Sequence, residues 1–145
     1  MNIKYINQLS VADFNKLRKI AGWLEIEETQ ALTGIKNSAF IISAVHDEQV
    51  VGFGRVVSDG GYVVLIAELA VLPEYQGKGI GTTMMKKIME YINNNLREGQ
   101  HVIVGLFASK EKESFYTPFG FTTRPNDELG GGMTQFIYYD ETHSR

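Results

Sequence analysis

The 145-residue sequence contains no cysteine and only three prolines and three histidines. Without cysteine, the chain has no disulfide, no thiolate nucleophile and no cysteine-ligated zinc. His46, His101 and His143 stand alone, without a second ligand at helical or hairpin spacing. We therefore expect no metal site.

Positive charge and long apolar runs are also scarce. The 14 Lys and Arg against 17 Asp and Glu give a net charge of −3, whereas a general nucleic-acid-binding protein usually has a basic face. The most apolar stretch, residues 62–72, contains Glu68 and is too short to span a bilayer. The first ten residues lack the apolar core of a signal peptide. We expect a cytoplasmic protein without nucleic-acid or membrane partners.

What is present is typical of a soluble globular domain, with 43% hydrophobic and 21% charged residues. No internal repeat, low-complexity tract or linker divides the chain, so we expect a single domain over residues 1–145. The sequence does not fix the oligomeric state, and a homodimer is compatible with it.

Hydrophobic periodicity and turn residues predict a mixed α/β sheet with flanking helices rather than a doubly wound sheet. Ser10 is expected to cap a helix with Val11, Phe14, Leu17 and Ala21 on one face. Further helices are expected at 27–32, ending at Gly34, and at 80–94 and 110–116. Strands are expected at 3–6, 39–45, 49–57, 62–72, 102–107, from 119, and at 133–139.

The glycine-rich loop Gln76–Gly81 lies between the strand at 62–72 and the helix at 80–94. Its spacing fits neither Walker A nor the dinucleotide fingerprint. The N-terminus of a helix attracts anions through its unpaired N–H groups, and glycines let an anion approach the backbone. Lys78 adds a positive charge, and Thr82 adds a hydroxyl in the first turn. The alternative is a strand-to-helix turn whose glycines only satisfy backbone geometry.

Three segments together resemble the GCN5-related N-acetyltransferases (GNAT). Gln76–Gly81 matches the Q/R-x-x-G-x-G/A signature of that family. The preceding "ELAVLPEY" resembles its fourth strand with a β-bulge, and "FYTPFGF", residues 115–121, resembles its Tyr-x-x-x-Gly-Phe element. The resemblance implies the GNAT fold, a central, mostly antiparallel sheet with flanking helices, and an acetyl-CoA-dependent N-acetyltransferase.

The resemblance also implies where acetyl-CoA binds. Its pyrophosphate would lie on the backbone of the loop, and its pantetheine would pair with the backbone of the preceding strand. The residues implied in cofactor binding are Leu69, Ala70, Val71, Gln76, Gly77, Lys78, Gly79, Ile80, Gly81 and Thr82. Where many relatives carry an asparagine after the fifth strand, this chain has Ala108-Ser109-Lys110, so no side-chain contact is expected there.

Acetyl transfer to an amine requires a neutral amine, a donor for the oxyanion and a proton for the departing thiolate. A backbone N–H near Val71, left free by a bulged strand, is the candidate oxyanion donor. Tyr116 is the candidate acid, because a phenol with a pKa near 10 holds its proton at neutral pH and is close enough to a thiol pKa of about 8.5 to protonate the departing thiolate. The alternative for Tyr116 is packing against the strand at Gly120-Phe121.

Glu68 is the conspicuous charge in an apolar run. Strand alternation places it on one face with Ala70, and Leu69 and Val71 on the other. A buried carboxylate has a raised pKa, which suits a base near neutral pH or a ligand for the substrate amine. The alternatives are an ion pair with Arg55 on the adjacent strand, and water relaying the amine proton.

The acceptor side is expected among an aromatic ring and carboxylates that together hold an ammonium group. The candidate residues are Trp23, Glu25, Glu27, Glu28, Asp127, Glu128 and Gly130–Gly132; a solvated helix face and loop would have the same composition. We expect transfer to a primary amine of a small molecule in a direct ternary complex, since no cysteine can carry an acetyl group. The alternatives are a protein N-terminus or lysine as acceptor, and a regulatory module that binds acetyl-CoA without catalysis.

Overall fold

The computed structural model describes residues 1–139 of the chain. These residues form two compact units, Met1–Phe107 and a second unit that begins at Ala108, and each unit is described by itself. Among residues 1–139, no helix combines the length and the apolar character needed to cross a membrane.

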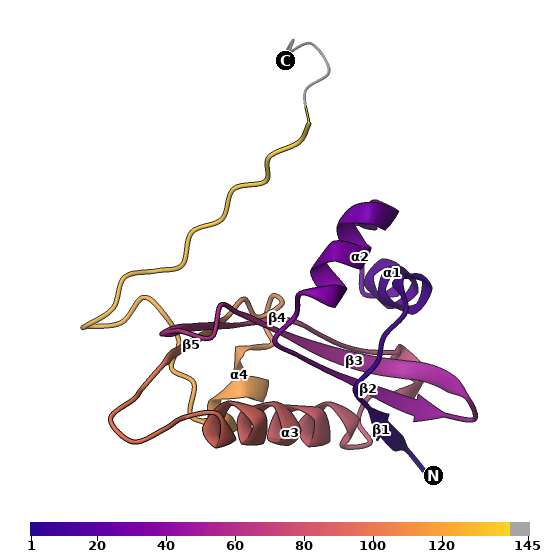
Figure 1. The fold of residues 1–145 in the computed structure, drawn as a ribbon, viewed down its shortest axis with the longest axis horizontal. Helices are drawn as coiled ribbons and strands as arrows, with labels where there is room; N and C mark the ends of the chain where they lie inside the picture. Colours follow the sequence, from indigo (N-terminus) through magenta and orange to yellow (C-terminus); the bar gives the residue numbers. More distant parts are fainter. Residues whose placement is uncertain (140–145) are drawn as a thin grey trace. The chain divides into compact units, whose positions relative to one another are not determined.

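The first unit is built on a five-stranded sheet in the order β1-β2-β3-β4-β5 (Figure 1). The strands are β1 Lys4–Ile6, β2 Phe40–His46, β3 Gln49–Ser58, β4 Val63–Val71 and β5 Ile103–Leu106. The first three pairings are antiparallel and β4 pairs with β5 in parallel. The mixed, mostly antiparallel sheet predicted from the sequence is therefore confirmed.

Helices cover both faces of this sheet. They are α1 Val11–Ile20, α2 Glu28–Lys36 and α3 Ile80–Asn94. Phe14 of α1 packs on Phe53 of β3, with ring centroids 5.5 Å apart. The neighbouring Gly54 lies under α3 instead, since a Cβ there would approach Ile88 Cδ1 at 2.9 Å. Adjacent strand residues point to opposite faces, so α1 and α3 lie on opposite sides of β3.

The helix boundaries differ from the predicted ones in two places. Ser10 caps α1 by accepting a hydrogen bond from Asp13 N at 3.0 Å, as predicted, but the helix ends at Ile20 and Ala21 is exposed. Gly34 does not stop α2, which continues to Lys36. Two side chains mark its end by donating hydrogen bonds to carbonyls of the last turn. Asn37 Nδ2 donates to Thr33 O at 2.9 Å, and Ser38 Oγ donates to Gly34 O at 2.8 Å.

A β-bulge in β4 decides which way Glu68 points. Arg55 of β3 is opposite Glu68, but the next residue, Val56, is opposite Ile66, so Ala67 is the extra residue. Because β-strand side chains alternate, the extra residue reverses the faces beyond it. Ile66 therefore faces α3, and Glu68 faces α1.

The second unit carries helix α4 Glu113–Tyr116, followed by the 3-10 turn η2 Thr117–Phe119. Helix α4 is shorter than the predicted 110–116. The predicted strand from residue 119 is wrong, because Pro118 lies in the turn and Gly120 adopts a left-handed φ of 94°. The predicted strand at 133–139 is also wrong. Its apolar side chains are exposed, with Met133 at 92% and Ile137 at 83%, since alternation allows pairing but does not provide a partner strand.

Candidate functional site

The glycine loop ends in an open helix N-terminus. A 3-10 turn, η1 Pro73–Tyr75, follows β4, and Gly77 and Gly79 adopt left-handed φ values of 76° and 84°. Gly79 is the N-cap of α3, and its carbonyl accepts the first helical hydrogen bond, from Thr83 N at 2.9 Å. The N–H groups of Ile80, Gly81 and Thr82 therefore have no acceptor within the helix.

Nothing in the first turn of α3 competes with an anion for these donors. Gly79 provides no side-chain cap, and the turn contains no acidic residue. A Cβ at Gly77 or Gly79 would meet no atom within 4 Å, so the space beside the loop backbone is open, and Lys78 is exposed beside it. The loop therefore fits a phosphate group, which favours the predicted anion site over a turn that only reverses the chain.

Gln76 attaches the loop to the end of β4. Its Nε2 donates to Val71 O at 2.9 Å, so this amide is already engaged by the protein. The sequence predicts that Gln76 contacts the cofactor. In the structure, the Gln76 side chain holds the loop against the end of β4, and only the Gln76 backbone is left to contact the cofactor.

The outer edge of β4 is open where the loop begins. β5 pairs with β4 only over Val63–Ile66, and no other strand lies beside it among residues 1–139. Leu72 N donates to Val51 O at 2.8 Å, toward β3. Because backbone groups alternate in direction along an antiparallel strand, those of Leu69 and Val71 point to the opposite, open edge.

Ala70 differs from these two neighbours. It is the register partner of Phe53 on β3, and the same alternation directs its N–H and C=O toward that strand. The geometry therefore disfavours Ala70 as a backbone partner for pantetheine, whereas Leu69 and the N–H of Val71 remain available. The Val71 N–H is free because β5 ends its pairing at Ile66, not because of the bulge, which lies earlier, at Ala67.

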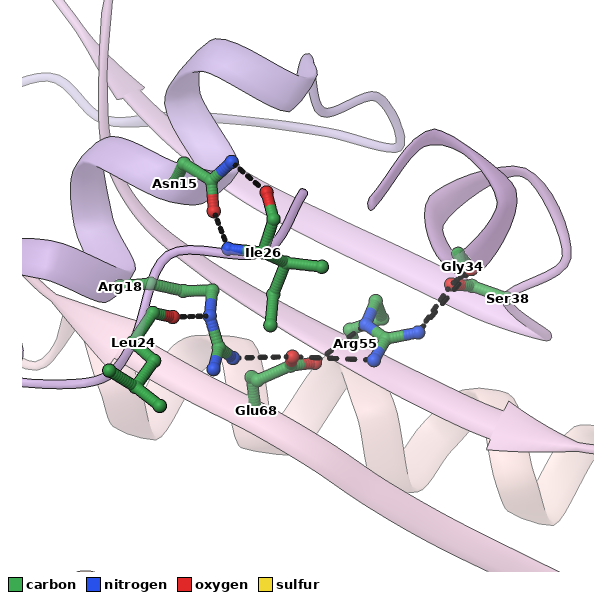
Figure 2. A network of polar contacts seen from close by, with 8 residues as sticks. All are labelled: Asn15, Arg18, Leu24, Ile26, Gly34, Ser38, Arg55 and Glu68. Atoms are coloured by element: carbon green, nitrogen blue, oxygen red, sulfur yellow. Dashed lines mark hydrogen bonds and ion pairs between the residues drawn. The ribbon is translucent and has the colours of Figure 1, made fainter. Parts of the chain in front are cut away.

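Glu68 lies between two arginines on the α1 face of the sheet (Figure 2). Arg55 Nε donates to its Oε1 at 2.6 Å and Arg55 Nη2 donates to its Oε2 at 3.3 Å. Arg18 Nη1 of α1 also donates to Oε2, at 3.0 Å. The Glu68 side chain is only 8% exposed. The structure thus favours the predicted ion pair with Arg55 over a free carboxylate base, since both oxygens already accept from guanidinium groups.

Arg18 is the residue of this site that the sequence analysis missed. Its guanidinium carbon lies 5.3 Å from the centroid of the Phe14 ring and 5.5 Å from that of Trp23, and its Nε donates to Leu24 O at 2.9 Å. The sequence carries one signal for it: a carboxylate in an apolar strand needs a counter-charge, and Arg18 directly follows the buried Leu17 on α1.

Tyr116 lies in the second unit, at the end of α4. Its ring meets those of Phe115 and Phe121 edge-on, with centroid separations of 5.0 and 6.3 Å. Burial raises the pKa of the Tyr116 phenol above 10.0, because the phenolate is poorly solvated there. The group therefore stays protonated at neutral pH, as an acid must. The Phe121 contact also matches the packing alternative.

These features agree with a comparison against known families. The model described as "Acetyltransferase (GNAT) domain" matches residues 37–123, which is more than half of the chain. The chain belongs to the GNAT acetyltransferases. It is accordingly an acetyl-CoA-dependent acyltransferase by family, and the matched range contains β2 to β5, the glycine loop and Tyr116.

Individual proteins support the same family. A Staphylococcus aureus protein described as a probable acetyltransferase of unknown function is 34% identical over 95% of this chain and 100% of its own, with a TM-score of 0.82. The uncharacterised N-acetyltransferase ycf52 of Pyropia yezoensis is 27% identical over 84% of this chain and 70% of its own length. Arabidopsis thaliana Naa50, solved with the bisubstrate analogue CoA-Ac-MVNAL, shares the fold at 18% identity over 86% of each chain, with a TM-score of 0.69.

Two acceptor-side residues expected of this GNAT chain, Trp23 and Glu27, have other partners in the structure. The Trp23 ring is stacked on Arg18, and the Glu27 carboxylate caps α2 by accepting from Thr29 N and Gln30 N, each at 2.9 Å. Glu25 and Glu28 are exposed, and Asp127 and Glu128 are exposed in the second unit. Within the first unit, Trp23 and Glu27 are thus engaged by Arg18 and by the start of α2, and the acceptor site stays a prediction.

Residues 1–139 contain no group of three or more His, Asp or Glu arranged to hold a metal ion. One hollow of about 480 Å³ is lined by residues of the C-terminal end of α3 and of the turn between β3 and β4, among them Tyr62, Tyr91 and Asn95. It lies at the opposite end of α3 from the glycine loop.

Proposed function

We propose that this chain transfers an acetyl group from acetyl-CoA to the primary amine of a small molecule, by direct attack in a ternary complex. One observation carries the proposal. The open edge of β4 at Leu69 and Val71 leads within a few residues to the open N-terminus of α3. A thioester with a long polar arm and a pyrophosphate needs these two features in this order.

The donor site uses mainly backbone groups. The N–H groups of Ile80, Gly81 and Thr82, with the glycines before them, would hold the pyrophosphate. Lys78 adds charge from an exposed position. The backbone of Leu69 would pair with the amide groups of pantetheine, as an added strand pairs with a sheet edge, and the N–H of Val71 would remain for the reacting carbonyl. Gln76 keeps the loop and the strand end together through Val71 O.

Two groups of the chain would assist the chemistry. The Val71 N–H, directed to the open edge, is positioned as a donor for the oxyanion, and one such donor is worth about 3 kcal/mol of barrier. Tyr116 would protonate the leaving sulfur. Its pKa, raised by burial, keeps the proton on the phenol until the thiolate forms. Water would take the amine proton, since Glu68 is engaged by Arg18 and Arg55.

A protein N-terminus is the second candidate acceptor. It is favoured by the shared fold with Naa50, which was solved with a CoA–peptide analogue. We prefer a small amine because the segment between α1 and α2 is held on the α1 side of the sheet, where Arg18 contacts both Leu24 of that segment and Glu68. Asn15 fixes that segment by a pair of hydrogen bonds with Ile26, both at 2.8 Å (Figure 2).

The test is an acetyl-transfer assay that follows free thiol release with a panel of amines. We expect amine-dependent release that saturates with acetyl-CoA, and an N-acetylated product by mass spectrometry. The matched blank omits the amine and reports hydrolysis. Tight acetyl-CoA binding without amine-dependent release, for small amines and for peptides, would support the non-catalytic module instead.

A further inference from the structure

Arg18 keeps unused hydrogen-bond donors at the centre of the site. A guanidinium has five N–H donors. The Nε donor of Arg18 goes to Leu24 O and one Nη1 donor goes to Glu68 Oε2. Nη2 has no hydrogen-bond partner in residues 1–139. Because no buried side-chain nitrogen or oxygen of the described chain lacks a partner, Nη2 must reach solvent.

This guanidinium is also held rigidly. Phe14 and Trp23 both lie within stacking distance of its carbon, at 5.3 and 5.5 Å. The Leu24 carbonyl and the Glu68 carboxylate fix its orientation within the plane. The side chain is 15% exposed. A ligand that binds Nη2 therefore loses little side-chain entropy from the protein.

The charge around Arg18 favours an anion. Glu68 carries one negative charge and contacts two guanidinium groups, Arg18 and Arg55, so the cluster keeps one positive charge. Most Arg55 donors are used within the protein, since its Nη1 donates to Gly34 O and Ser38 Oγ, each at 3.3 Å. The surplus charge is therefore presented to solvent by Arg18.

We propose that Arg18 is a specificity-determining residue that binds a carboxylate on the acceptor amine, so that the acceptors are amino acids rather than simple amines. The proposal rests on the proposed acetyl transfer. Glu68 precedes Val71 by three positions on β4, about 10 Å along a strand. In the acceptor, a chain of a few carbons between the amine and the carboxylate would span part of that distance. A planar carboxylate suits the guanidinium fork.

Matched amines test the proposal. The rate is measured as kcat/KM for 4-aminobutyrate against n-butylamine, and for 6-aminohexanoate against n-hexylamine, pairs that differ by the carboxylate. We expect at least one pair to favour the amino acid by about tenfold or more. Arg18→Met should abolish that ratio and Arg18→Lys should retain part of it. Arg55→Lys, which disturbs Glu68 without touching the exposed donors, should keep the ratio even where it lowers the rates.

The outcomes separate this proposal from the proposed function. Equal rates within both pairs, or a preference that survives in a folded Arg18→Met protein, would overturn the role of Arg18 while leaving acetyl transfer intact. Binding of 4-aminobutyrate and of n-butylamine is also measured by calorimetry with CoA present. If no amine is acetylated, the proposed function fails, and calorimetry decides for Arg18: tighter binding of 4-aminobutyrate supports it and equal binding refutes it. Melting temperatures show whether Arg18→Met folds. If it does not, the Arg18→Lys protein decides: a reduced amino-acid preference supports the role of Arg18, and an unchanged preference refutes it.

Discussion

At the scale of single residues, one β-bulge determines on which face of the sheet the Glu68 side chain lies, and therefore which partners it has. Strict alternation along β4 would place Glu68 on the α3 side with Val64 and Ile66. The extra residue Ala67 turns it toward α1, where Arg18 and Arg55 supply its counter-charges. A buried carboxylate that is neutralised in this way stabilises the arrangement of neighbouring elements rather than providing a free base.

Glu68→Gln should therefore act mainly on stability. The amide leaves two guanidinium groups without their counter-charge, and removing one partner of a buried ion pair typically costs about 3–5 kcal/mol. We expect a clearly lower melting temperature, a similar loss of rate at all pH values, and unchanged acetyl-CoA affinity. A rate loss confined to low pH, with the melting temperature of the native protein, would show instead that Glu68 is the base.

Tyr116→Phe separates acid catalysis from packing. The substitution keeps the ring contacts with Phe115 and Phe121 and removes only the hydroxyl. General acid catalysis is typically worth 10²–10⁴-fold, so kcat should fall by that range with little change in stability or acetyl-CoA affinity. An acyl donor with a better thiol leaving group should recover part of the rate. Full kcat in the variant would leave Tyr116 a packing residue.

The raised pKa of Tyr116 makes a second, independent prediction. Its folded-state pKa lies above the unfolded value because burial disfavours the phenolate. The stability that this contributes is present below about pH 10 and is lost as pH rises through the folded pKa. The stability difference between the native protein and Tyr116→Phe should therefore shift against the native protein only above pH 10. Denaturant unfolding at pH 8 and pH 11 measures it, and a shift already at pH 8 would contradict the assignment.

At the scale of elements, the sequence predicts what depends on local pattern and fails where a distant partner decides. The Ile80-Met84-Ile88-Ile92 spacing predicts α3 closely, because all four side chains are buried on one face. The Ser10 cap follows from a short-range signal in the same way. Arg18 escaped prediction because its partner Glu68 is 50 residues away. The open edge of β4 depends on where β5 stops pairing, which no local pattern shows.

The N-cap of α2 is an element-scale feature that can be titrated. The pKa of the exposed Glu27 carboxyl is lowered from its ordinary 4.5 by hydrogen bonds from the backbone N–H of Thr29, then of Gln30. A lowered pKa contributes stability above the unfolded value that is lost as pH falls through the folded one. Glu27→Gln should thus lower the melting temperature at pH 7, and the difference should shrink below pH 4.5. Glu25→Gln is the control, because Glu25 is exposed and does not cap a helix. Its melting temperature should not differ from that of the native protein in this pH-dependent way.

The start of α3 should control acetyl-CoA affinity through its shape. Gly79 is a poor position for this test, because its φ of 84° strains any other residue regardless of ligand. Gly81 lies within α3, so Gly81→Val keeps an allowed backbone and adds bulk beside the exposed N–H groups. We expect at least a tenfold loss of acetyl-CoA affinity by calorimetry, with native circular dichroism, and a smaller loss for Lys78→Ala. Unchanged affinity in a folded Gly81→Val protein would remove the phosphate site.

At the scale of the whole molecule, the two compact units, 1–107 and from Ala108, raise the question of whether they fold together. The proposed donor groups lie in the first unit and the proposed acid, Tyr116, in the second. The GNAT match runs from residue 37 to residue 123, across the boundary. A single domain over residues 1–145 therefore stays a prediction, which the match across the boundary favours.

A single domain should unfold in one step, and acetyl-CoA should shift that step as a whole. We expect one calorimetric transition whose calorimetric and van't Hoff enthalpies agree, as in two-state unfolding. A ligand at 100 times its dissociation constant adds about 2.7 kcal/mol to the stability of whatever unfolds with its site.

Two spectroscopic signals follow the two units separately. The pyrophosphate would contact only Gln76–Thr82, in the first unit, and the fluorescence of Trp23, which lies in the same unit, reports its unfolding. Tyrosine absorbance compared between the native protein and Tyr116→Phe reports the second. Both signals should move to higher temperature together. Two transitions, of which acetyl-CoA raises only the one seen by Trp23, would show that the units are separate domains and that Tyr116 reaches the thioester only in a subset of conformations.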